Sequence, residues 1–234
     1  MLLLAFETSA KAASVALFEG ETLLGESYQN TGLTHSQTLM VMAEDLIKQC
    51  GCTPADITHT AVAAGPGSFT GVRIGVAAAK GFAWGKEIPC FGVSTLEAMA
   101  LGLGIWEGTV VCTMDARRAQ VYNAVFEAKN GQLTRIREDR AIALLDLEAD
   151  LQSVQSPIYL VGDGAALCKR TITGLNLILP PQWRQHQRAV GVGLAALAAM
   201  ERGETGDAAT LAPNYLRLSQ AERERLEKEH KGEK

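Results

Sequence analysis

Residues 65–75 have the composition of a loop that could bind phosphate. The stretch reads Gly-Pro-Gly-Ser-Phe-Thr-Gly-Val-Arg-Ile-Gly and separates a short apolar run from a helix-like run. Backbone N–H groups at the start of a helix can surround an anion. The spacing lacks the Lys-Ser/Thr of a Walker loop and differs from the GxGxxG dinucleotide fingerprint. Because glycine also lets a helix lie close to a sheet, ligand binding and close packing both remain open.

Nucleophile and metal motifs are weak in this chain. The four histidines, at positions 35, 59, 186 and 230, include no pair at i, i+3 or i, i+4, and there is no HExxH segment. The five cysteines, at 50, 52, 90, 112 and 168, include no CxxC pair, so we expect reduced and mostly buried thiols. Ser68 could act as a nucleophile with His35, but a hydroxyl at the start of a helix is typically an N-cap.

Length and charge limit the remaining classes. The chain has 234 residues, 47% of them hydrophobic, which is enough for one large domain or two small ones. Its net charge of −4 provides no overall basic field for nucleic acid, so we expect RNA to be held by another protein. No apolar run reaches membrane length or has the form of a signal peptide, which predicts a cytoplasmic protein without membrane contact.

The predicted secondary structure repeats. The first half predicts strands at 2–7, 13–18 and 22–28, a helix at 35–50, a strand at 59–64, a helix at 69–86, a strand from 88 to 93 and a short helix through 99. The second half predicts strands at 109–114, 120–127 and 132–137, a helix at 143–151, a strand at 158–162, and helices near 164–170 and 189–202. This order indicates an α/β protein of two duplicated βββαβα units with a cleft between two lobes.

The repeat also sets the expected domain boundaries. We expect an N-terminal lobe over 1–105, a C-terminal lobe over 106–217 and a charged tail over 218–234. The last sixteen residues include ten charged ones, so they cannot contribute a core.

Two predicted helices carry more apolar surface than one sheet needs. On the 69–86 helix, small residues face inward, and a second side remains largely apolar. On the 35–50 helix, an apolar stripe includes Met40 and Met42. We therefore expect an adhesive surface for another protein. The expected interface residues are Leu39, Met42, Leu46, Arg73, Val76, Ala77, Lys80 and Trp84.

Six segments together resemble the bacterial TsaB (YeaZ) family. They are Glu7-Thr8-Ser9, the 65–75 turn, Ala79-Lys80-Gly81, Gly92-Val93-Ser94-Thr95-Leu96, Asp115-Ala116-Arg117-Arg118 and Pro213-Asn214-Tyr215-Leu216-Arg217. The resemblance runs from residue 2 to about residue 217. It implies a fold of the sugar-kinase, Hsp70 and actin (ASKHA) type.

The resemblance also implies a function. Members of the family are accessory subunits in the threonylcarbamoyl modification of the adenosine next to the tRNA anticodon. The implied partners are a catalytic TsaD-type subunit, which forms a heterodimer with the accessory protein, and a TsaE-type ATPase, while a TsaC-type enzyme supplies threonylcarbamoyl-adenylate. The resemblance further implies a homodimer when the protein is alone, and only indirect contact with tRNA.

A comparison with the catalytic relative bears on chemistry. That relative has a Gly-Val-Asn-His-Leu-Glu-Gly-His segment whose two histidines bind the metal, and matching it to residues 92–99 places Thr95 and Met99 at those positions. Neither side chain replaces imidazole on a divalent ion. We therefore expect no catalytic residue, no metal site and no cofactor required by this chain, with ATP or ADP bound at most at an interface shared within the complex.

A vestigial nucleotide site remains open, because folds of the implied type hold ATP through turns that follow their strands. The candidate residues are Glu7, Thr8, Ser9, Asp115, Gly162 and Gly164. Ala116 and Arg117 stand where the second phosphate turn usually has a glycine. Two rival hypotheses also stay open. One is an ATP-using transferase or kinase acting alone, and the other is direct tRNA recognition through Arg117, Arg118, Arg135, Arg137 and Arg140.

Overall fold

The first lobe is built on a five-stranded mixed sheet of order β3-β2-β1-β4-β5. The computed structural model describes residues 1–105 and 107–217, so the expected charged tail lies outside the described residues. Three strands form an antiparallel meander, and two more run parallel to the first of them. These strands are β1 (Leu2–Glu7), β2 (Ala13–Glu19), β3 (Thr22–Gln29), β4 (His59–Gly65) and β5 (Cys90–Ser94).

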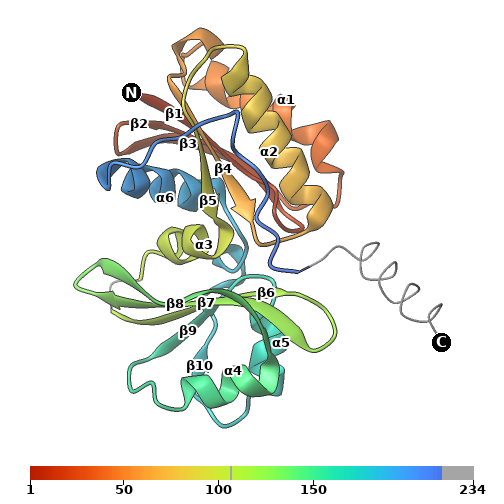
Figure 1. Cartoon of the computed structure of the whole chain (residues 1–234), viewed down its shortest axis with the longest axis vertical. Coiled ribbons are helices and arrows are strands. Elements are labelled where there is room, and N and C mark those ends of the chain that lie inside the picture. The colour runs from red at the N-terminus through yellow and green to blue at the C-terminus, as the bar shows by residue number, and fades with distance from the viewer. Residues whose placement is uncertain (106, 218–234) are drawn as a thin grey trace, which may run out of the picture.

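Alternation along β1 divides its side chains between two cores. Leu4 and Phe6 point to one face, which α1 (His35–Gln49) and α2 (Phe69–Trp84) cover. Leu3 and Ala5 point to the opposite face, which α6 (Ala189–Glu201) covers. A strand buried on both faces reads as a continuous apolar run, which is what residues 2–6 show. Figure 1 shows α1 and α2 side by side over the sheet.

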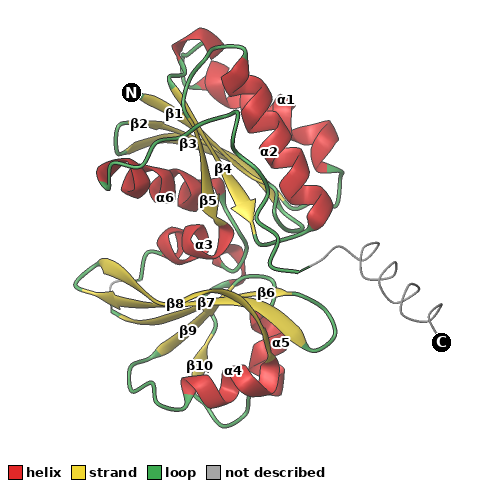
Figure 2. Ribbon diagram, in the orientation of Figure 1, coloured by secondary structure: helices red, strands yellow, loops and turns green. Residues whose placement is uncertain are grey.

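The second lobe repeats this plan. Its sheet has the order β10-β9-β6-β7-β8, which corresponds strand for strand to β5-β4-β1-β2-β3 (Figure 2). Two helices, α4 (Leu144–Leu151) and α5 (Ala165–Thr171), cover one face. The strands are β6 (Gly108–Asp115), β7 (Gln120–Lys129), β8 (Gln132–Ala143), β9 (Ile158–Val161) and β10 (Leu177–Ile178). The predicted duplication of βββαβα units is confirmed.

The two units exchange their third helices. Helix α3 (Thr95–Leu103) follows the first sheet but packs through Leu96 and Met99 against the second. Helix α6 follows the second sheet but packs through Val192 and Ala196 against the first. The two helices meet between the sheets (Figure 1). Each sheet needs a helix on its second face and takes that helix from the other half of the chain. The two packed units therefore do not coincide with the expected segments 1–105 and 106–217.

The segment after α6 also returns to the first lobe. Residues 202–217 run back past β5 and α2, where the N–H of Asn214 donates to the carbonyl of Ala64 over 2.6 Å. Two short 3-10 helices, η1 (Pro54–Asp56) and η2 (Gln182–Arg184), and the two-residue β10 were not predicted, because they are shorter than the period on which a sequence pattern depends. In the described part of the chain, no helix combines the length and hydropathy needed to cross a membrane.

Candidate functional site

The glycine turn at residues 65–75 is filled by the protein's own backbone. The N–H of Ser68 donates to the carbonyl of Ser9 over 2.6 Å, and the Thr8 hydroxyl donates to the carbonyl of Gly71 over 2.8 Å. A Cβ atom added at Gly67 or Gly71 would overlap the carbonyl oxygens of Ser9 and Thr8. These glycines therefore let α2 approach the end of β1, which supports close packing over a phosphate cradle.

Glu7 is a buried carboxyl group at the end of β1. Its Oε1 accepts a hydrogen bond from the N–H of Ser9 over 2.5 Å, whereas its Oε2 and the Ser9 hydroxyl have no partner within the described residues. Burial raises the pKa of Glu7 to about 7, and the charge of Asp163 acts in the same direction against the lowering effect of the Ser9 hydrogen bonds. Burial therefore disfavours the charged form of Glu7.

The turn after β9 packs closely against the end of β6. A Cβ atom at Gly162 would overlap the carbonyl of Thr113, and one at Gly164 would lie 3.0 Å from the backbone carbon of Met114. Between them, Asp163 accepts a hydrogen bond from the buried Gln187 over 3.3 Å. The side chain of Asp163 reaches solvent, yet the walls of the cleft limit its hydration and raise its pKa.

Asp115 opens a left-handed turn in the second lobe. Its Oδ1 accepts the N–H of Arg117 over 2.7 Å. Arg117, Arg118 and Ala119 all have positive φ angles, of 62°, 56° and 57°. Left-handed backbone is costly for residues other than glycine, so this turn holds a strained conformation at the surface.

These turns meet in a cleft of about 610 Å³ between the lobes. Basic side chains (Lys11, Arg117 and Arg217) and carboxylates (Asp115 and Asp163) both line it. The mixed charge could hold a polar ligand, but the cleft has no dominant sign. Of the six candidate nucleotide residues, the structure places Ser9 and Asp115 on its wall, while the glycines and Thr8 serve packing.

Three residues that sequence reasoning did not assign to this cleft also contribute. Tyr215 stacks on Phe69 with 4.6 Å between ring centroids, and Arg217 donates to the carbonyl of Ala116 over 2.6 Å. Gln187 holds Asp163. Tyr215 and Arg217 belong to the Pro213–Arg217 segment that the sequence singled out, but its local pattern does not place it at the cleft.

The positions that correspond to metal ligands in the catalytic relative are part of the core. Thr95 and Met99 are buried, and Met99 packs in the cluster between α3 and the second sheet. Across residues 1–105 and 107–217, no group of three or more His, Cys, Asp or Glu side chains could hold a metal ion. Ser68 caps α2 by accepting the N–H of Gly71, and His35 bonds to the carbonyl of Ala10, so the two do not form a catalytic pair.

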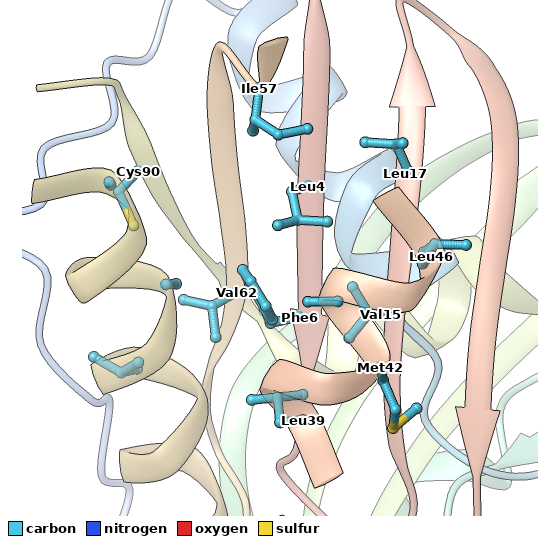
Figure 3. Close-up of a cluster of buried hydrophobic side chains, with 14 of the residues drawn as sticks. Leu4, Phe6, Val15, Leu17, Leu39, Met42, Leu46, Ile57, Val62 and Cys90 are labelled. Atoms are coloured by element: carbon cyan, nitrogen blue, oxygen red, sulfur yellow. The ribbon is translucent and has the colours of Figure 1, made fainter. Parts of the chain in front are cut away.

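The expected interface residues on α1 are wrong. Leu39, Met42 and Leu46 are 1%, 4% and 6% exposed and belong to the core cluster with Phe6 and Val15 (Figure 3). The physical reason is that the apolar stripe of an amphipathic helix is used first against its own sheet. On the outward side of α1, Met40 is 45% exposed.

The expectation for α2 holds only in part. Val76 is buried in the same core, which corrects its assignment. Lys80 is half-buried because its Nζ donates to the carbonyls of Ala209 and Leu211 in the returning segment. Arg73, Ala77 and Trp84 are exposed. We call Met40, Arg73, Ala77, Gly81 and Trp84 the α1–α2 outer surface, since all are exposed residues of adjacent helices.

Most arginines proposed for direct tRNA contact are paired. Arg135 forms ion pairs with Glu97 at 2.9 Å and Asp139 at 2.5 Å. Arg137 and Arg140 both pair with Asp150. Of the five arginines, Arg117 and Arg118 are exposed and take no part in these ion pairs; both belong to the left-handed turn. The described second lobe therefore offers no broad basic face built from these residues.

The chain is similar to known proteins over nearly its whole length. A family model described as "TsaD: tRNA N6-adenosine threonylcarbamoyltransferase" matches residues 29–224. The tRNA threonylcarbamoyladenosine biosynthesis protein TsaB of Bacillus subtilis is 33% identical over 230 residues, covering 97% of this chain and 99% of that protein. The Escherichia coli protein of the same name is 34% identical over 167 residues, covering 70% and 72%.

Solved structures agree with the sequence comparison. A Pseudomonas aeruginosa protein described as similar to peptidase YEAZ superposes with a TM-score of 0.82 at 26% identity, covering 92% of this chain and 99% of that chain. YeaZ from Pseudomonas aeruginosa has a TM-score of 0.78 at the same identity and coverage. The expected two-lobed α/β fold of two duplicated units is confirmed. The chain belongs to the TsaB (YeaZ) family of tRNA threonylcarbamoyladenosine biosynthesis proteins.

Proposed function

We propose that this chain is a non-catalytic scaffold in the threonylcarbamoyl modification of the adenosine next to the tRNA anticodon. Its likeness to TsaB proteins over almost the whole chain supports the role in tRNA modification. The observation that supports the non-catalytic part is the glycine turn, where the backbone carbonyls of Ser9 and Thr8 pack against Gly67 and Gly71.

The proposed partner is a TsaD-type catalytic subunit that binds the α1–α2 outer surface. Trp84 is 68% exposed and Met40 45% exposed, which are large fractions for apolar side chains. Ala77 and Gly81 lie between the larger side chains of α2 and would allow a partner helix to approach closely. A TsaE-type ATPase would join this pair, with ATP or ADP held at the shared interface. The same surface would form a homodimer when the catalytic subunit is absent.

An association measurement tests the surface. Ala77→Glu and Trp84→Glu each place a charge on it without disturbing the core, and we expect each to weaken binding to the purified catalytic subunit by about tenfold or more. Leu145→Glu is the matched control, because Leu145 is 74% exposed on α4 of the other lobe. Val76 is unsuitable, since a charge at this buried position would unfold the protein. Unchanged association of both folded α2 variants would remove the proposed surface.

A reconstitution experiment tests the role itself. tRNA is incubated with the other subunits and threonylcarbamoyl-adenylate, with and without this chain. We expect modified adenosine only when the chain is present. Equal modification without it would exclude the proposed function.

The second candidate function is an ATP-using transferase or kinase that acts alone. The observation in its favour is the inter-lobe cleft of about 610 Å³ with Lys11, Arg117 and Arg217 on its wall. Calorimetry with ATP and magnesium separates the two candidates. Micromolar binding that disappears in Asp115→Ala would favour the enzyme.

A further inference from the structure

The loop before α6 presents an aromatic side chain among cationic ones. Residues 180–188 read Pro-Pro-Gln-Trp-Arg-Gln-His-Gln-Arg. Trp183, in the 3-10 helix η2, is 63% exposed. It lies beside α3 and the start of α6, whereas α1 and α2 cover the opposite face of the first sheet, so the proposed partner surface does not account for it. An exposed indole combines a large apolar face with a polar N–H, which suits contact with a planar ligand.

The loop that carries Trp183 is held in place by hydrogen bonds. The N–H of Arg184 donates to the carbonyl of Pro181 over 2.8 Å, and Gln185 Nε2 donates to the carbonyl of Pro180 over 2.8 Å. The carbonyl of Gln185 in turn accepts the N–H of Gly162 over 2.7 Å, which fixes the loop to the end of β9. The indole is therefore presented by a rigid segment, and a ligand would not have to order it.

The charges around Trp183 favour an anionic ligand. The Arg184 guanidinium lies 5.0 Å from the indole centroid and donates to the carbonyl of Leu103, and it has no carboxylate partner in the described part of the chain. Arg188 is different, because Glu26 pairs with it and its charge is compensated. His186 adds a further ring to the same hollow. The uncompensated positive charge next to Trp183 is thus that of Arg184.

A small hollow adjoins the indole. Its volume is about 210 Å³, and its walls combine Trp183, Arg184 and His186 with Met99, Gly102 and Leu103 of α3. The paired side chains of Glu26 and Arg188 also line it. The α3 wall is largely apolar, whereas the loop wall is aromatic and cationic. A planar, partly apolar group with an attached anion fits this combination, since the plane can stack on the ring and the anion can reach the guanidinium.

We propose that Trp183 and Arg184 form a binding site for an unpaired nucleotide of RNA. The base stacks on the exposed indole, and Arg184 contacts the adjoining phosphate. Aromatic stacking and arginine contacts of this kind are the usual means by which proteins bind unpaired bases. The proposal rests on the proposed role in tRNA modification, and it adds a direct RNA contact made by this chain, outside the inter-lobe cleft.

Binding of a labelled oligoadenylate RNA of about ten nucleotides to the full chain tests the proposal. At low salt, we expect Trp183→Ala to weaken binding by about tenfold, which is the typical effect of removing one stacking side chain. Trp183→Phe should retain part of the affinity. Leu145→Ala is the control, because Leu145 is an exposed apolar residue on α4 outside both proposed binding surfaces, and it should bind the RNA as the unchanged protein does. Arg184→Glu should weaken binding and reduce the steepness of its salt dependence.

Several results would overturn the site. These are no binding of the single strand by the folded wild-type protein, equal binding of Trp183→Ala, and equal affinity for a duplex of the same length. Tighter, Trp183-dependent binding of an oligoglutamate peptide would assign the hollow to a protein partner instead. The same variants are also tested for association with the catalytic subunit. Loss of RNA binding with intact association separates failure of this site from failure of the proposed scaffold.

Discussion

Glu7 is a buried carboxyl group at the end of β1, and its protonation should affect the stability of the protein. Burial raises its pKa to about 7 from an ordinary value of 4.5. Between these two values the unfolded chain has lost the proton while the folded protein keeps it. The free energy of unfolding therefore falls as pH rises through this window, by up to about 3 kcal/mol from this group.

Replacing Glu7 with glutamine should remove this dependence. Glu7→Gln keeps an acceptor for the N–H of Ser9 and cannot ionise. We expect its free energy of unfolding in urea to fall less between about pH 4.5 and 7 than that of the wild type. Asp163, whose pKa is also raised, leaves a residual slope in both proteins. Identical pH profiles for variant and wild type would show that Glu7 is not the titrating group.

Two glycines of α2 provide a matched test of the close-packing interpretation. A Cβ atom at Gly71 would overlap the carbonyl of Thr8, whereas one at Gly81 would meet nothing within 4 Å. We expect Gly71→Ala to destabilise the protein by about 1–3 kcal/mol through overpacking. Gly81→Ala should stabilise it by up to about 1 kcal/mol, because alanine favours an exposed helix. Urea unfolding of the two variants measures both effects, and equal values would argue against a filled turn.

At the level of helices and strands, the periodicity of apolar residues predicted most of the fold. It also predicted a partner surface on α1 that lies in the core. Alternating and helical patterns located most strands and helices of both lobes within a few residues, although the predicted strand at 132–137 ends well before β8 does, at Ala143. The pattern on α1 also identified Leu39, Met42 and Leu46 as one apolar stripe, but a stripe does not reveal what covers it. One face of the first sheet, which includes Leu4, Phe6 and Val15, packs against that stripe, so the surface left for a partner is the less apolar side of each helix.

The path of residues 202–217, which return to the first lobe, could not be predicted from periodicity. Its position depends on single contacts with residues far away in the chain, such as the bond from Arg73 Nε to the Tyr215 hydroxyl over 2.7 Å. These contacts have no local period. The polar turns of the cleft could be located from the sequence, because each follows a strand, but Tyr215, Arg217 and Gln187 could not be assigned to them.

Tyr215 should fix the end of the returning segment. Its ring stacks on Phe69, and its hydroxyl accepts the hydrogen bond from Arg73. In Tyr215→Ala, we expect faster hydrogen exchange of the Asn214 N–H, which donates to Ala64, with little change in the core strands. Tyr215→Phe retains the stacking and should exchange at an intermediate rate. Exchange at the wild-type rate in Tyr215→Ala would mean that other contacts hold the segment.

The exchange of α3 and α6 makes the two lobes depend on each other. Arg135 of β8 pairs with Glu97 of α3, and Arg188 at the start of α6 pairs with Glu26 of β3. Each third helix is thus tied to the sheet of the opposite half, in addition to its apolar packing. Neither sheet can bury both faces without residues from the other half of the chain. A scaffold built in this way presents its two lobes as one body, which suits a protein whose proposed role is to hold partners in position.

The contact between α3 and α6 offers the decisive test of this interdependence. A Cβ atom at Gly191 of α6 would overlap the carbonyl of Ala98 of α3, so Gly191→Leu should force the helices apart and cost about 1–3 kcal/mol. If the lobes unfold together, hydrogen exchange of β1 and of β6 should report the same loss of stability, and calorimetry should show one transition. Leu145→Ala, at an exposed position of α4, should leave both unchanged. A loss confined to one sheet, or two separate transitions, would show that the lobes are independent despite the exchanged helices.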